Sequence, residues 1–166
     1  MNARMVLIAV TAALTLVVSG RTAGANENRN FVAPLAAGDE VQTPAVESDA
    51  AGLAKFQLSA EGDALSFKLI VANIDNVLFA HIHCGAEGVN GPVVVFLYDG
   101  PTVTTNGVLS EGTVNASDII PRPDSAACPG GISNFDELIA KMESGGAYTN
   151  VHTTAFPAGE IRGQIR

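Results

Sequence analysis

Apolar and polar residues alternate with a period of two along much of the chain, a pattern typical of β-strands with one buried face. The alternation is clearest at residues 53–58 and 65–71, and residues 60–63 between them form a turn signal. We therefore predict a hairpin in which Lys55 and Lys68 point to solvent. The side chains expected in the core are those of Phe56, Leu58, Leu65, Phe67 and Leu69.

More strand signals follow, separated by turns. They are expected at residues 31–35, 77–83, 92–98, 107–114, 147–153 and 159–166, with a turn at 73–76. One amphipathic helix is predicted to begin after Ser133 or Asn134 and to end at Gly145-Gly146. Because the strands are short and do not alternate with helices, we predict an all-β fold. The expected architecture is an antiparallel Greek-key or immunoglobulin-like β-sandwich with one late α-helix.

The N-terminal segment has the features of an export signal. Arg4 precedes an apolar stretch that is too short to span a bilayer comfortably, and Ala23-Gly24-Ala25 fits a cleavage site. We predict a cleaved signal peptide at 1–25, a flexible segment at 26–30 and one domain at 31–166. An uncleaved N-terminal anchor is the alternative.

Charge narrows the choice of partners. The chain carries 17 acidic and nine basic residues, and cleavage of the signal peptide would remove two arginines and no acidic residue. This excess of negative charge disfavours nucleic acid and anionic membranes as partners. We expect a monomeric protein, secreted or periplasmic, that does not bind membranes after cleavage.

The two cysteines of the chain are Cys84 and Cys128. In an exported protein an even number of cysteines favours a disulfide. It would close a loop of about 45 residues and contribute up to about 4 kcal/mol in the loop-entropy description. The alternative is that Cys84, beside His83, is a thiolate ligand of a metal.

All three histidines lie in predicted strands. His81 and His83 are spaced i, i+2, so both rings project from the same face of one strand. If the strand with His152 is its neighbour, three imidazoles converge, which is the smallest set expected for a transition-metal site. We predict a single copper or zinc ion, since imidazole suits both metals. Alternatively, the histidines are buried hydrogen-bonding groups and bind no metal.

Several acidic residues are candidates for a fourth ligand or for a carboxylate that orients an imidazole. They are Asp75, Glu87, Asp99 and Glu160. The alternative is that they are ordinary acidic residues of the surface. The alternation around Glu160 places it on one strand face with Arg162 and Gln164. Glu160 and Arg162 are therefore predicted to form the outer shell of the site, either paired with each other or bonded to the histidine strands.

Signals for catalysis are weak. No Gly-x-Ser-x-Gly nucleophile motif is present, and the expected disulfide argues against Cys84 as a catalytic thiol. The glycine-rich segment after His83 lacks the lysine and the helix start of a phosphate-binding loop. We predict no catalytic residues.

A series of ordered motifs covers nearly the whole predicted domain. They read LAAGDEVQTP at 35–44, AHIH at 80–83, GA at 85–86, NGPVVV at 90–95, AYTNVHT at 147–153 and PAGEIRGQI at 157–165. This set resembles the CHRD (chordin-type) domain family, in its bacterial, single-domain, secreted form. The resemblance implies an extracellular binding module without an established general activity. The family's histidines correspond to His81, His83 and His152, and its acid–base pair corresponds to Glu160 and Arg162.

The order of motifs is also similar to that of copper/zinc superoxide dismutases, which are Greek-key β-sandwiches. Those enzymes need six histidines and an aspartate for two metals, so three histidines exclude the full bimetallic site. The leading prediction is a binding module that holds one copper or zinc ion. The alternatives are a metal-free structural or protein-interaction domain with an extracellular protein partner, and a copper-only, dismutase-like enzyme.

Overall fold

The computed structural model describes residues 30–166. The predicted signal peptide and residues 26–29 lie outside this range. Asn30, which the sequence assigns to the flexible segment, already belongs to the first strand. Within residues 30–166, no helix is long and apolar enough to cross a membrane.

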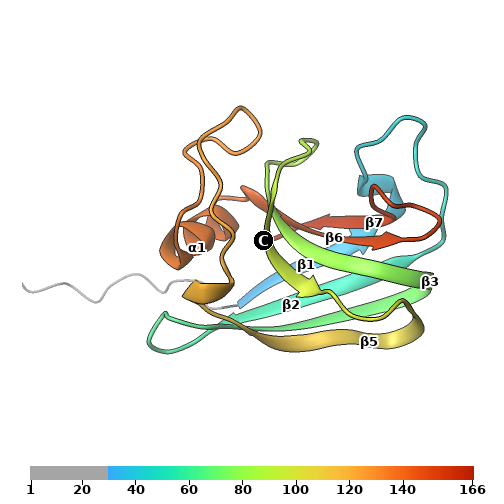
Figure 1. Ribbon diagram of the computed structural model, residues 1–166, viewed down its shortest axis with the longest axis horizontal. Helices are drawn as coiled ribbons and strands as arrows, with labels where there is room; N and C mark the ends of the chain where they lie inside the picture. Colours follow the sequence, from blue (N-terminus) through green and yellow to red (C-terminus); the bar gives the residue numbers. More distant parts are fainter. Residues whose placement is uncertain (1–29) are drawn as a thin grey trace, which may run out of the picture.

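Seven antiparallel strands and one short α-helix make up the described part of the chain (Figure 1). The strands are β1 (Asn30–Ala36), β2 (Ala51–Leu58), β3 (Leu65–Cys84), β4 (Val93–Tyr98), β5 (Val103–Val114), β6 (Ala147–Thr153) and β7 (Ile161–Gln164). The helix is α1 (Phe135–Glu143), and two 3₁₀ turns are η1 (Ala37–Asp39) and η2 (Ala116–Asp118). The predicted all-β class with one late helix is confirmed.

The strand pairing closes on itself. The strands follow the order β2-β1-β7-β6-β3, and β3 also pairs with β2, so these five strands form a barrel. Strands β4 and β5 each add to β3 outside this ring. The Greek-key or immunoglobulin-like sandwich is not confirmed. Each half of β3 is paired along both of its edges. Strand β3 therefore joins all the strands into one sheet.

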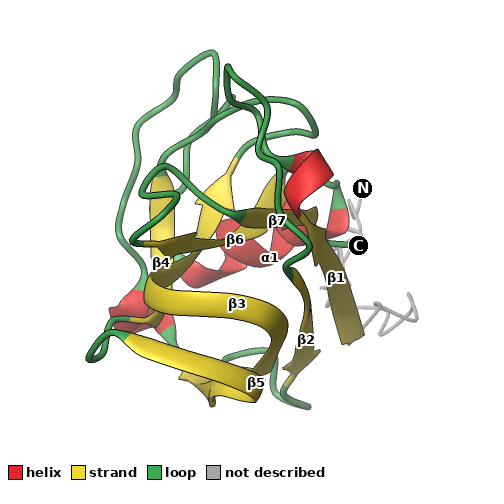
Figure 2. Ribbon diagram, turned by 90° about the vertical axis from the view of Figure 1, so that its right-hand side faces the viewer, coloured by secondary structure: helices red, strands yellow, loops and turns green. Residues whose placement is uncertain are grey.

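Strand β3 is long and bent (Figure 2). Its first half pairs with β2 and β5, and its second half pairs with β6 and β4. The expected turn at 73–76 is a bend within this strand, where Asn73 and Asn76 have positive φ angles of 55° and 52°. The two backbone N–H groups at the bend donate to side chains of β5, those of Asn106 and Thr104. Because these bonds replace the missing ladder contacts, the strand bends and does not reverse.

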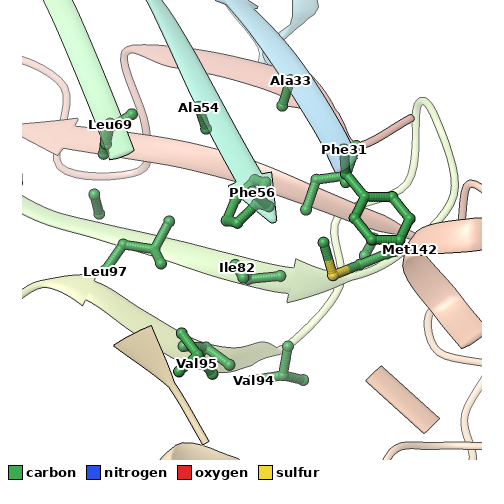
Figure 3. Packing of buried hydrophobic residues seen from close by; sticks show 14 of the residues in the cluster. Phe31, Ala33, Ala54, Phe56, Leu69, Ile82, Val94, Val95, Leu97 and Met142 are labelled. Atoms are coloured by element: carbon green, nitrogen blue, oxygen red, sulfur yellow. The ribbon is translucent and has the colours of Figure 1, made fainter. Parts of the chain in front are cut away.

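The barrel interior is apolar. Figure 3 shows side chains from several strands packed together, with Ile82 of β3 beside Phe56 of β2. Helix α1 covers one end of the barrel. The Asn134 side chain caps the helix by accepting a hydrogen bond from the Glu137 N–H. The buried face of α1 consists of Phe135, Leu138, Ile139 and Met142, so the helix is amphipathic as predicted.

Cys84 and Cys128 are joined by a disulfide with a Cα–Cα distance of 5.4 Å. Both cysteines are buried. The bridge ties the end of β3 to the long segment that precedes α1. Neither sulfur is therefore available as a thiolate ligand, and the disulfide is consistent with an exported protein.

Candidate metal centre

The three histidines meet on the outer face of the barrel wall. His81 and His83 project from β3 on the side opposite Ile82, and His152 projects from the neighbouring strand β6. Their ligand nitrogens all lie within 4.8 Å of one another. Two nitrogens on one zinc ion lie at most about 4 Å apart, given bonds of about 2.0–2.1 Å. The rings would therefore have to move inward to coordinate one ion together.

Backbone carbonyls fix the tautomers of two of these rings. His83 Nδ1 donates to the Gly91 carbonyl at 2.8 Å, and His152 Nδ1 donates to the Pro157 carbonyl at 3.0 Å. Since a carbonyl only accepts, the Nε2 atom of each neutral ring carries a lone pair. His81 Nδ1 lies 3.1 Å from His152 Nε2 and donates to it when no metal is bound.

A close approach of the backbone makes the Gly91 contact possible. The segment between β3 and β4 folds back so tightly that a Cβ at Gly91 would lie 1.6 Å from the Cys84 carbonyl oxygen. Only glycine fits there. The fold-back places the Gly91 carbonyl against His83, which directly precedes the disulfide-bonded Cys84. This segment and residues 40–50 lie on the same side of the barrel, the upper side in Figure 1.

Burial keeps the three imidazoles neutral. Desolvation, followed by the repulsion of His152 and His83, lowers the pKa of His81 to about 3. Desolvation also lowers the pKa of His83 to about 4. The Gly91 carbonyl and the Asn150 side chain, which can accept from His83 Nε2 only when the ring is protonated, act in the opposite direction. The pKa of His152 is lowered by burial as well. Neutral imidazole is the form that binds metal ions.

Tyr148 and Arg162 form a stack beside His83. The Tyr148 and His83 rings are stacked with centroids 4.7 Å apart, and Arg162 Cζ lies 3.4 Å from the Tyr148 centroid. The Arg162 guanidinium donates to the carbonyl oxygens of Ala86 and Val89 and to Asn90 Oδ1. It therefore ties the segment that carries Gly91 to the barrel wall.

Glu160 is buried but does not pair with Arg162. Its two carboxylate oxygens accept hydrogen bonds from Ser48 Oγ and Thr153 Oγ1, each at 2.6 Å. Thr153 follows His152 in β6. Neither Glu160 nor Arg162 is hydrogen-bonded to a histidine. Arg162 stacks on Tyr148, which in turn stacks on His83.

The other acidic candidates lie away from the cluster. Asp75, Glu87 and Asp99 are exposed, and Glu87 lies 3.7 Å from Arg166 in a surface ion pair. In the described part of the chain, the group able to hold a metal contains the three histidines and no carboxylate.

Sequence reasoning missed two polar residues at the centre of the site. Asn150 is 3% exposed and Tyr148 is 3% exposed, and both are on the same face of β6 as His152. The period-two spacing of 148, 150 and 152 was a usable signal. Two aromatic residues, Phe79 and Phe96, flank His81 on its open side and are 40% and 46% exposed.

A comparison with family models gives a match to the CHRD domain over residues 31–165, which is nearly the whole chain. The chain belongs to the CHRD domain family. All the residues of the candidate centre lie within the matched part of this CHRD domain. A search of curated proteins found no match, and a search of solved structures found none.

Proposed function

We propose that this CHRD domain is an exported binding module that holds one copper or zinc ion through His81, His83 and His152. The observation that carries the proposal is the convergence of the three ring nitrogens on one sheet face, within 4.8 Å of one another. Membership of a family of binding domains supports a binding role. The ligand set suits copper and zinc, because imidazole is a good ligand for both.

The surroundings of the three rings fit a metal site. Carbonyls hold Nδ1 of His83 and His152, and ligating histidines in metalloproteins usually have such a partner on the second nitrogen. His83 Nε2 is buried and has no hydrogen-bond partner. A metal ion would satisfy this lone pair, whose desolvation otherwise costs free energy.

Arg162 and Glu160 support the centre from outside in this proposal. Arg162 holds the loop that presents the Gly91 carbonyl, and Glu160 fixes β6 next to His152 through Thr153. Their role is to keep the imidazoles in place, and neither is proposed to touch the ion.

The direct test is calorimetric titration of the metal-stripped protein, without its signal peptide, with Cu(II) and with Zn(II). Thr149 provides a matched control, because it lies on β6 with its unpartnered hydroxyl on the opposite, interior face. We expect one ion per chain in the wild type and in Thr149→Val, and loss of binding in His81→Ala, His83→Ala and His152→Ala. Histidine variants that bind like the wild type would contradict the proposal.

A metal-free interaction domain is the second candidate. It is supported by the contact between His81 and His152, which is a satisfactory hydrogen bond without any ion. In that case the titrations give no signal, and histidine substitutions change only stability. A dismutase-like enzyme is the third candidate. It requires superoxide-dependent turnover by the copper-loaded protein.

A further inference from the structure

We propose that the side-chain oxygen of Asn150 is the fourth donor of this centre. Three imidazole nitrogens and one amide oxygen then make the site selective for divalent copper or zinc over Cu(I). This inference rests on the proposed metal-binding function, and it adds a ligand and an oxidation state to it.

Asn150 occupies the middle of the histidine cluster. In the sheet register it lies directly opposite His81, and it is two residues from His152 on the same face of β6. His83 is its diagonal neighbour, because His83 lies opposite Tyr148. Opposite side chains in a sheet have Cβ atoms about 4.5–5.5 Å apart, and diagonal ones about 7–8 Å. All three imidazoles therefore border the Asn150 amide.

Two lone pairs at this position have no partner. Asn150 is 97% buried, since 3% of it is exposed, and its Oδ1 atom makes no hydrogen bond. His83 is 8% exposed, and its Nε2 is likewise without a partner. Both atoms are acceptors, so they cannot satisfy each other. A cation between them would satisfy both, and native structures rarely leave such buried groups unpaired.

The orientation of the amide is set from the opposite side. Asn150 Nδ2 donates to Glu40 Oε1 at 3.1 Å. Because a carboxylate accepts and an amide oxygen cannot donate, this contact assigns the nitrogen to the Glu40 side and turns Oδ1 away from it. Glu40 itself comes from the segment after β1 that covers this face of the barrel.

Gly159 makes room for the Glu40–Asn150 pair. A Cβ at Gly159 would lie 2.4 Å from both Asn150 Nδ2 and Glu40 Oε1. The residue also has a φ of +130°, which side chains disfavour. The local backbone therefore leaves space for the contact that aims the amide oxygen at the histidines.

The donor set decides which ions are favoured. Amide oxygen is a hard ligand, whereas Cu(I) is selected by soft thiolates and thioethers. The two cysteines form the disulfide. Met142, the methionine of the described residues, lies on the buried face of α1. Oxygen from Asn150 therefore adds to the affinity for Cu(II) and Zn(II) and adds little for Cu(I).

The test compares Asn150→Ala and Asn150→Asp with the wild type and with Thr149→Val as the control on the same strand. Each protein is titrated with Cu(II), with Zn(II), and with Cu(I) supplied as its acetonitrile complex without thiols, so that the disulfide stays intact. Electron paramagnetic resonance of the Cu(II) form reports the donor set. Thermal unfolding of the metal-free proteins checks that each variant is folded.

For Asn150→Ala we expect Cu(II) and Zn(II) affinity to fall about 10–100-fold, Cu(I) affinity to change less than about threefold, and the Cu(II) spectrum to change. Asn150→Asp keeps an oxygen donor but loses the hydrogen bond to Glu40, so it should bind the divalent ions more tightly than Asn150→Ala. Equal losses for all three ions, or an unchanged spectrum and affinity, would overturn the Asn150 inference while the three-histidine site stands. A wild type that binds no metal would overturn both.

Discussion

The two faces of β6 behave differently, although both are buried. Thr149 and Val151 point into the apolar barrel, where they pack against other strands. Asn150 and His152 point outward, yet Asn150 is sealed under the loops that cross this face. The interior is stabilised by packing, whereas the outer layer is held by hydrogen bonds to loop carbonyls and carboxylates. Stability and binding are therefore expected to depend on different faces of the same strands.

Substitutions of Ile82 and of its neighbour His81 should distinguish the contributions of the two faces most clearly. Ile82 is fully buried inside the barrel (Figure 3), so Ile82→Ala should destabilise the protein by about 3–4 kcal/mol through the cavity it leaves. Metal affinity of the folded fraction should be unchanged. His81→Ala should give the opposite result, with binding lost and a smaller loss of stability. Urea denaturation and calorimetry measure the two effects, and parallel changes in both variants would contradict the separation.

Arg162 is the residue of the outer layer whose substitution we expect to lower stability most. It is 2% exposed and donates to three oxygen atoms of the loop 85–91. Arg162→Lys keeps the charge but not the planar set of donors, and we expect a loss of about 2–3 kcal/mol. The variant should also weaken metal binding, because the loop carries the Gly91 carbonyl. Chemical denaturation and titration of Arg162→Lys test this, and a variant as stable as the wild type would refute it.

Acid should weaken the outer layer first. Burial lowers the pKa of His81 to about 3 and that of His83 to about 4, below the value of about 6.5 expected for the unfolded chain. Between these values the unfolded chain binds more protons than the folded protein. The stability contributed by the neutral rings is therefore fully present above about pH 6.5 and falls as the pH decreases toward 4.

The measurement is the denaturation midpoint of the metal-free protein, with a chelator present, at pH 7.5 and at pH 5. His81→Leu removes one of the three histidines whose pKa is lowered. Its midpoint should depend less on pH than that of the wild type. Identical pH dependence in the two proteins would show that these rings are not desolvated in solution.

The smallest effect is expected at the surface of the β3–β5 pair. Lys68 and Glu111 lie 2.7 Å apart, but their side chains are 47% and 60% exposed. Lys68→Ala should therefore change stability by less than about 1 kcal/mol and should leave metal binding unchanged. A larger loss in urea denaturation would mean that this exposed pair stabilises β5 more than surface ion pairs usually do.

Local patterns predicted the features that depend on neighbouring residues. The hairpin of β2 and β3, with Lys55 and Lys68 outward, follows from alternation, and the Asn134 cap follows from the residues around it. The i, i+2 spacing of His81 and His83 placed both rings on one face for the same reason. These features need no knowledge of which strands become partners.

Long-range pairing could not be predicted in this way. The closure of the barrel depends on a bend at Asn73 and Asn76, because β3 pairs with β2 before the bend and with β6 after it. That bend is stabilised by side chains about 30 residues away. Alternation also assigns outward residues to solvent, so it could not indicate that Asn150 and Arg162 are buried. Their burial depends on loops whose paths are set by Gly91 and similar close contacts.

The most direct test of a metal centre on this outer face is anomalous diffraction from crystals of the copper- or zinc-loaded protein, collected on both sides of the metal edge. We predict one peak per chain between His81, His83 and His152, at about 2.0–2.1 Å from a nitrogen of each ring. An absence of anomalous density at the histidines, or a peak only at surface carboxylates, would contradict the account. The cluster would then be a metal-free hydrogen-bonded layer.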